Sequence, residues 1–210
     1  PLAAQDLHAL VELALLLATA LWGVTFPVIK LSLEDTGPFL FLMLRCGFGA
    51  LLLWPLMRFR IPSRSSVGMG VLLGGLQVVA FFTQTAGLQF TTATRSAFIT
   101  GLSVVIVPVL YPLWTRRRPE RWPLLGAGLA VAGLYEFTNP EAGGLNRGDV
   151  LTLACAAVYA VFIIVLERAT RRHPFEDMLV LQMLVLAVAY VPGAAWEGFS
   201  LDRPRAAFSR

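Results

Sequence analysis

Charge is scarce in this sequence. Charged residues make up 14% of the 210 residues and apolar residues make up 57%, whereas soluble domains average about one quarter charged. The mean hydropathy is +0.70. A net charge of +4 would suit a nucleic-acid partner, but the arginines stand where apolar runs end rather than along a stripe of their own. The composition therefore indicates an integral membrane protein and argues against nucleic-acid binding.

Histidine and cysteine are almost absent. The histidines are His8, near the amino terminus, and His173, in a basic loop, while Cys46 and Cys155 lie inside apolar runs without a CxxC motif. We therefore expect buried free thiols, no metal site and no Ser–His protease centre in the bilayer. The motifs GxGxxG, GxxxxGK(S/T) and HExxH are missing as well. The sequence predicts neither an enzyme nor a cofactor.

What the sequence does contain is a series of long apolar runs. A membrane-spanning helix needs about 20 mostly apolar residues, and seven segments come close to that length. They cover residues 10–31, 38–57, 67–88, 96–114, 122–137, 150–166 and 175–191. We expect Asp149 to cap the sixth segment and Pro192-Gly193 to end the seventh. The predicted fold is all-α, a polytopic membrane helix bundle.

The loops between these segments alternate in basic charge. Three of them carry clustered arginines: Arg58, Arg60 and Arg64; Arg116, Arg117, Arg118 and Arg121; Arg168, Arg171 and Arg172. The intervening loops carry only Arg95 and Arg147. Because basic loops stay in the cytoplasm, we expect the amino terminus inside and the seventh helix to end outside.

A weak internal repeat has an offset of 137 residues. The stretch ATALWGVTFPVI aligns with CAAVYAVFIIVL, which places Trp22 on Tyr159, and the same offset places Arg45 on Gln182. Five helices separate equivalent points, so the copies cross the membrane in opposite directions, as in the inverted repeats of secondary transporters. We expect residues 1–138 to form a first five-helix repeat and residues 146–210 to begin a second. Seven of ten expected transmembrane helices would be present, with three more after Arg210.

Ionisable side chains inside a bilayer cost about 2.5 to 3.5 kcal/mol at its centre, so the few present are candidates for function. Arg45 lies about one third of the way into the second segment. It either fixes helix packing through an ion pair or a carbonyl contact, or lies near an anionic group of a substrate. Lys30, the only lysine, either reaches the lipid headgroups from the first segment or contacts a substrate or gate.

Polar side chains of the third and fourth segments are further candidates. Gln77, Gln84 and Thr100 either hydrogen-bond across helices or line a cavity for a polar metabolite. Gln182, the repeat counterpart of Arg45, joins them as a substrate-binding candidate.

Trp22 and Tyr159 are the aromatic candidates. As repeat-related rings at corresponding depths, they either pack in the bundle or line opposite walls of a substrate pocket.

Prolines and small residues indicate where helices bend and touch. Pro27 and Pro108 each remove a backbone hydrogen bond inside an apolar segment, and we interpret them as hinges or static bends. Gly70 and Gly74 have the GxxxG spacing that permits close helix contact.

Four stretches carry a resemblance to a known family. They are ALLLATALWGVTFPVIKLSLEDTGPFLFLMLRCGFGALLLWP, AGLQFTTATRSAFITGLSVVIVPVL, GAGLAVAGLY and GDVLTLACAAVYAVFIIVLERATRR. In this order and spacing they resemble the EamA-type transporters of the drug/metabolite transporter superfamily. The resemblance covers essentially the whole chain and implies two inverted five-helix repeats.

The resemblance also implies a function. It predicts a secondary transporter that moves a small metabolite, amino acid-like or amphipathic, across the bacterial inner membrane by alternating access, with export as the direction. The implied partners are the solute and the lipid bilayer; a homodimer is compatible with the sequence but not indicated by it.

Two alternatives belong to other classes. A non-transporting membrane partner or regulatory subunit predicts a closely packed interior in which polar residues of the third and fourth segments pair with each other. A membrane-embedded enzyme needs an acid/base pair converging in one pocket, and the sequence offers none.

Overall fold

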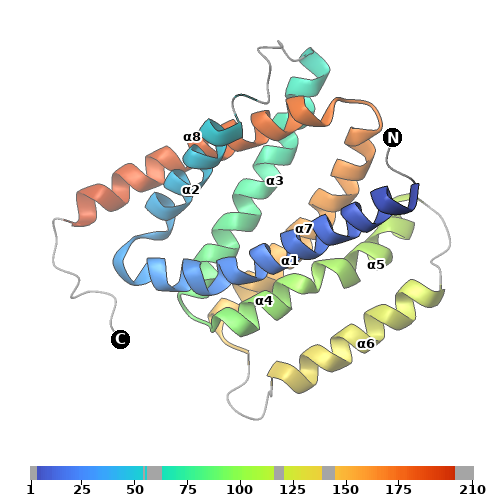
Figure 1. The fold of residues 1–210 in the computed structure, drawn as a ribbon. Coiled ribbons are helices and arrows are strands. Elements are labelled where there is room, and N and C mark those ends of the chain that lie inside the picture. The colour runs from blue at the N-terminus through green and yellow to red at the C-terminus, as the bar shows by residue number, and fades with distance from the viewer. Residues whose placement is uncertain (1–3, 54, 56–62, 116–120, 139–144, 202–210) are drawn as a thin grey trace.

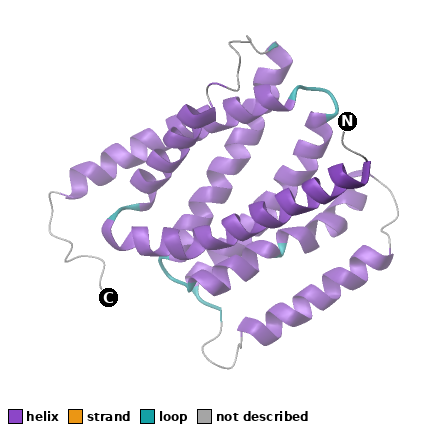
Figure 2. Cartoon of the chain, in the orientation of Figure 1, coloured by secondary structure: helices purple, strands orange, loops and turns teal. Residues whose placement is uncertain are grey.

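The computed structural model describes residues 4–53, 55, 63–115, 121–138 and 145–201. Within these residues the chain forms helices and no strand (Figure 2). The helices are α1 (Ala4–Asp35), α2 (Pro38–Leu53), α3 (Arg64–Leu88), α4 (Ala93–Gly101), α5 (Ser103–Thr115), α6 (Arg121–Thr138), α7 (Arg147–Thr170) and α8 (Phe175–Leu201). Since only Leu102 separates α4 from α5, the described chain follows seven helical segments. The predicted all-α fold is confirmed.

Five segments of the described chain are long and apolar enough to cross a membrane. They are His8–Asp35, Arg64–Leu88, Ala93–Pro112, Arg147–Thr170 and Phe175–Gly198. Pro38–Leu53 is apolar but shorter, and α6 has 18 residues. The fold is therefore that of a polytopic helical membrane protein, while the ten-helix arrangement stays a prediction.

α3 is the central helix of the bundle, with α7 and α8 packed along it (Figure 1). A Cβ atom on Gly70 would lie 2.6 Å from the Cβ of Leu181, and one on Gly74 would lie 2.7 Å from the Cβ of Val185. Both distances are too short for any side chain, so only glycine permits this approach. The GxxxG spacing of α3 is thus used for contact with α8.

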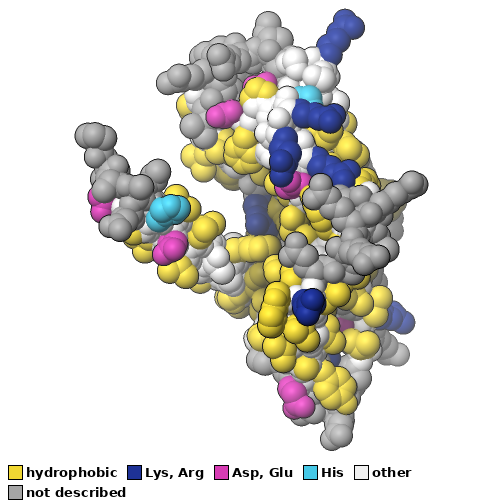
Figure 3. All heavy atoms as spheres, turned by 90° about the vertical axis from the view of Figure 1, so that its right-hand side faces the viewer, with side chains coloured by type: hydrophobic (Ala, Val, Ile, Leu, Met, Phe, Trp, Pro, Cys, Tyr) yellow, Lys and Arg dark blue, Asp and Glu magenta, His cyan; other side chains and the backbone are white. Residues whose placement is uncertain are grey.

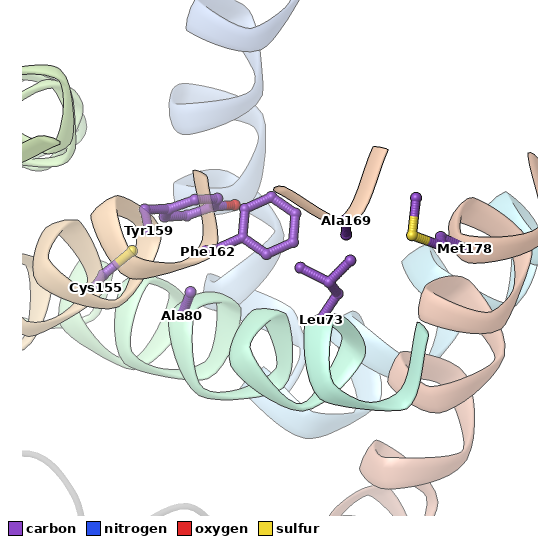
Figure 4. Close-up of a cluster of buried hydrophobic side chains, with 7 residues drawn as sticks. All are labelled: Leu73, Ala80, Cys155, Tyr159, Phe162, Ala169 and Met178. Atoms are coloured by element: carbon purple, nitrogen blue, oxygen red, sulfur yellow. The ribbon is translucent and has the colours of Figure 1, made fainter. Parts of the chain in front are cut away.

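The contact between α3 and α7 also depends on glycine. A Cβ atom on Gly148 of α7 would lie 2.4 Å from the carbonyl oxygen of Gly87 in α3. Further along the two helices, a buried cluster joins Leu73 and Ala80 of α3 to Tyr159 and Phe162 of α7 (Figure 4). Backbone contact at one end therefore leads into side-chain packing along the helix pair.

The predicted end of the seventh segment is wrong. α8 continues through Pro192 and Gly193 to Leu201. A Cβ atom on Gly193 would lie 2.3 Å from Phe39 of α2, so the glycine lets α2 approach. Beyond it, Glu197 accepts hydrogen bonds from the backbone N–H groups of Phe39, at 3.2 Å, and Leu40, at 2.8 Å. These contacts with α2 hold the last turns of α8 in place, although Pro192-Gly193 predicts that the helix ends before them.

The predicted cap of α7 is also wrong, by one turn. The N-cap residue is Asn146, whose side chain accepts a hydrogen bond from the backbone N–H of Asp149 at 2.9 Å. The Asp149 carboxylate accepts in return from the backbone N–H of Asn146 at 3.0 Å. This reciprocal pair is a capping box.

The basic residues at the end of α7 lie beside the start of α3 and the end of α5. The hydroxyl of Ser66 and Nδ1 of His173 are 3.3 Å apart, and the guanidinium of Arg168 lies 5.8 Å from the ring centroid of Trp114. Several of the dark-blue side chains in Figure 3 gather over this end, and we call it the basic end. The other predicted basic positions, Arg58, Arg60 and Arg116–Arg118, lie outside the described residues.

The first half of α1 stands away from the bundle (Figure 3). Leu16 and Leu21 are exposed, whereas Phe26 and Ile29 are buried together with Leu88 of α3. Pro27 lies within the unbroken α1.

The fourth segment is interrupted ahead of its predicted hinge. Pro108 lies within α5, and the break falls at Leu102. The hinge roles of Pro27 and Pro108 stay predictions.

Gly74→Ala should destabilise the bundle, whereas Gly75→Ala should not. Overpacking against Val185 costs about 1–3 kcal/mol. Around Gly75 nothing lies within 4 Å of the added Cβ, so alanine there should add about 0.5–1 kcal/mol of stability through its helix propensity. The thermal unfolding midpoint in detergent, followed by circular dichroism, measures both effects. Equal shifts for the two variants would contradict the α3–α8 packing described here.

Candidate functional site

Tyr159 of α7 lies at the centre of an aromatic cluster. Its ring centroid is 6.1 Å from that of Trp22 in α1, 6.1 Å from that of Phe81 in α3 and 6.1 Å from that of Phe162 in its own helix. These spacings are within the range of favourable aromatic pairs. Tyr159 is 8% exposed and Trp22 is 44% exposed. The cluster therefore has a buried centre and a more accessible edge on α1.

The position of Tyr159 follows from a stripe of buried residues on α7. Thr152, Cys155, Ala156 and Ala160 are all fully buried and recur with helical spacing around it. Because three of these neighbours are small, α3 comes close to α7, and the larger rings of Tyr159 and Phe162 extend across α3 (Figure 4).

Arg45 of α2 adds a cation to this cluster. Its guanidinium carbon lies 5.1 Å from the ring centroid of Phe81, a distance that fits a cation–π contact. Its Nη1 atom is buried and has no hydrogen-bond partner among the described residues. A buried donor without a partner costs about 1–3 kcal/mol. We call Trp22, Arg45, Phe81, Tyr159 and Phe162 the aromatic–arginine site.

Gln77 lies one helical turn before Phe81 on α3. Its Oε1 atom is buried and likewise has no hydrogen-bond partner in the described part of the chain. Native proteins leave few such atoms. The unpaired donor of Arg45, on α2, thus lies next to the ring of Phe81. The unpaired acceptor of Gln77 lies one helical turn from Phe81 along α3.

Gln84, Thr100 and Gln182 lie elsewhere. The amide of Gln84 donates a hydrogen bond to the hydroxyl of Thr100 at 3.2 Å, and both side chains are buried. Gln182 is buried where α8 meets α3, beside Gly74. The structure therefore brings Trp22, Arg45 and Tyr159 into one cluster but places these three predicted residues outside it.

A buried ion pair joins α4 to α7 where both helices begin. Arg95 and the Asp149 carboxylate are 2.9 Å apart, with Asp149 fully buried. The hydroxyl of Thr91 donates a hydrogen bond to the same carboxylate at 2.6 Å. We call this region, where α3 ends and α4 and α7 begin, the ion-pair end.

Lys30 binds at the same end. Its ammonium donates hydrogen bonds to the carbonyl oxygens of Leu88 and, at 3.0 Å, Thr91. A cation at the carboxyl end of a helix is favourable because it satisfies carbonyls that have no partner within the helix. Lys30 therefore fastens α1 to the end of α3.

A groove of about 610 Å³ opens near the basic end. It lies between α3, α5 and α7, and we call it the basic groove. Its lining residues are Met69, Leu72, Leu76, Trp114, Val161, Val165, Arg168, Ala169, Arg171, Arg172 and His173. The groove is apolar along the helices and basic at one end.

Comparison with known proteins identifies the family. Residues 9–138, which are 130 of the 210 residues, match the EamA-like transporter family. The chain belongs to this family. The family is one of transporters by name.

Two relatives of this EamA-like chain are also transporters by name. An uncharacterized transporter of Archaeoglobus fulgidus is 31% identical over 161 residues, which are 76% of this chain and 50% of the relative. The uncharacterized transporter YvbV of Bacillus subtilis is 27% identical over 196 residues, which are 89% of this chain and 64% of the relative. The chain thus spans about half the length of the first relative. No solved structure matches it.

Sequence reasoning missed Phe81 and Phe162 of the aromatic–arginine site in this EamA-like chain. Each is an apolar residue within an apolar run, so hydropathy does not distinguish it from its neighbours. One signal is available for Phe81, because it follows Gln77 by four residues and therefore shares a helix face with that glutamine. The buried role of Asp149 was missed for another reason: its partners Thr91 and Arg95 are distant in sequence.

Arg45→Met should leave the thermal unfolding midpoint unchanged or raise it. The substitution removes a buried nitrogen that has no described partner, worth about 1–3 kcal/mol, and loses a partly desolvated cation–π contact worth about 1–2 kcal/mol. Arg95→Met is the matched control, since it leaves the buried Asp149 carboxylate without its cationic partner and should cost about 3 kcal/mol. If Arg45→Met lowers the midpoint as much as Arg95→Met does, Arg45 is a structural residue.

Proposed function

We propose that this chain forms part of a secondary transporter that exports a small amphipathic metabolite bearing a carboxylate. The observation that carries the proposal is the buried Nη1 of Arg45, without a partner among the described residues, beside an aromatic cluster. A guanidinium binds a carboxylate through charge-assisted hydrogen bonds, and aromatic rings bind the apolar part of the same molecule. Family membership supports the transport activity itself.

The inverted repeat is part of this proposal. In it, residues 1–138 are the first five-helix repeat and residues 146–210 begin the second. Trp22 and Tyr159 occupy equivalent positions in the two copies, and their rings are neighbours at 6.1 Å. A site at the interface of two inverted repeats is what such transporters use for solute binding. The short distance between the two rings supports the proposal that Trp22 and Tyr159 form opposite walls of one site.

Alternating access would require the ion-pair end to open. There Arg95 and Asp149 connect α4 to α7, and Lys30 connects α1 to the end of α3. The same contacts that hold this end together must separate for a solute to leave through it. With the basic end in the cytoplasm of a bacterial cell, the ion-pair end faces outward and its opening completes export.

One observation favours the alternative of a non-transporting partner or regulatory subunit. Gln84 and Thr100, on α3 and α4, bond to each other, which is what a closely packed interior predicts. The unpaired atoms of Arg45 and Gln77 argue the other way. A transport assay separates the two functions.

Full-length protein reconstituted in liposomes should exchange labelled amino acids or amphipathic carboxylates. Arg45→Met should lower that exchange about tenfold or more, since a hydrogen bond to a charged group contributes about 1.5–3 kcal/mol, while insertion is retained. Amide analogues of the same compounds should be affected much less.

Arg147→Gln serves as the charge-matched control because Arg147 is exposed at the ion-pair end. It should leave exchange unchanged. An equal loss for carboxylates and amides in Arg45→Met would sink the proposed carboxylate contact. If no compound in a broad panel of amino acids, nucleosides and amphipathic solutes is exchanged, the partner-subunit function is favoured instead.

A further inference from the structure

The basic groove adjoins the aromatic–arginine site, because Leu76 and Val165 of its wall pack against the cluster that contains Tyr159 and Phe162. Its lining residues include none of the five that form that site. The three arginines Arg168, Arg171 and Arg172 stand at one end of it, and none of the described residues that line it is acidic. It therefore needs an explanation of its own.

Two of these arginines are available for an anion. Arg171 is paired with Glu167, whose carboxylate lies 2.6 Å from the guanidinium and raises the pKa of Arg171 through this hydrogen bond. By contrast, no described carboxylate lies within ion-pair distance of Arg168 or Arg172. Arg168 is instead held over the ring of Trp114 at 5.8 Å. The groove thus presents two cations that are not neutralised by described residues.

The loop that carries Arg172 is fixed in place. The next residue, His173, has its Nδ1 3.3 Å from the hydroxyl of Ser66, which is buried in the first turn of α3. The amino end of α3 adds partial positive charge at the same place. The positive end of the groove is therefore held by contacts between α3 and the end of α7.

The rest of the groove is apolar. Leu72 and Leu76 of α3, Trp114 of α5 and Val161 of α7 line it along the direction of the helices. Trp114 is 54% exposed, as expected of a tryptophan at the level of lipid headgroups. A small anion would use only the basic end and leave these walls without a partner. A ligand with an anionic head and a hydrocarbon chain matches both parts.

We propose that the basic groove binds an anionic phospholipid, with its phosphate between Arg168 and Arg172 and an acyl chain along Leu72, Leu76 and Val161. Basic pockets between membrane helices suit such headgroups because the cations are near the surface and the walls are apolar. This is a lipid site distinct from the proposed solute site. It does not depend on transport, and its test has no transport readout.

Native mass spectrometry of the purified full-length chain measures the bound lipid directly. The probes are phosphatidylglycerol and phosphatidylcholine with identical acyl chains, and inorganic phosphate as a competitor. Phosphatidylglycerol should be retained preferentially. Arg168→Gln and Arg172→Gln should each weaken its binding about fivefold, whereas Arg147→Gln, at the opposite end of α7, should have no effect. Leu72→Trp, which fills the apolar wall at an exposed position, should also lower retention.

Three results would overturn the proposal. Equal retention of the two lipids would show that the groove does not recognise an anionic headgroup. If Arg147→Gln weakens phosphatidylglycerol binding as much as Arg168→Gln does, the lipid responds to the general surface charge and not to this groove. Displacement of the lipid by inorganic phosphate, together with unchanged binding in Leu72→Trp, would identify a site for small anions. The thermal unfolding midpoint of each variant shows whether a loss of bound lipid follows from unfolding instead. Arg172 lies at an exposed loop position, so Arg172→Gln should leave the fold unchanged and test the headgroup contact alone.

Discussion

α3 approaches α7 and α8 so closely that this contact sets the position of every other helix packed around it. Helices in a bilayer gain little by exchanging lipid for apolar protein surface, so their association depends on packing at short distance. Gly70 and Gly74 permit it toward α8, and Gly87 and Gly148 permit it toward α7. With α3 fixed on two sides, its Phe81 meets Tyr159 from one direction and Arg45 from another.

Buried polar groups have hydrogen-bond partners at the ion-pair end but lack some of them in the middle of the bundle. Asp149 is fully buried but accepts hydrogen bonds from Thr91 and Asn146 and pairs with Arg95. Arg45 has one buried nitrogen with no such partner among the described residues. In a medium of low dielectric a satisfied network holds helices together, whereas an unpaired cation costs stability. A solute carboxylate would remove that cost, which links binding to the stability of the loaded state.

The cationic side chains at the two ends of the bundle differ in whether they have partners within the described chain. At the ion-pair end, Lys30 and Arg95 are committed to carbonyl and carboxylate partners within the chain. At the basic end, Arg168 and Arg172 remain open to the surroundings, next to apolar walls and Trp114. Internal pairing holds the ion-pair end closed in this structure, whereas cations without a described partner favour contact with an anionic membrane surface.

The number and approximate position of the helical segments could be predicted from hydropathy alone, because each crossing needs about 20 apolar residues, and the repeat register pointed to Trp22 and Tyr159. It also indicated the close contact at Gly70 and Gly74. Which groups meet could be read only from the packed helices. Phe81 joins the site and α8 runs past Pro192 because contacts with distant helices hold them there. Hydropathy and spacing report on a residue's own helix, whereas such contacts depend on how separate helices pack.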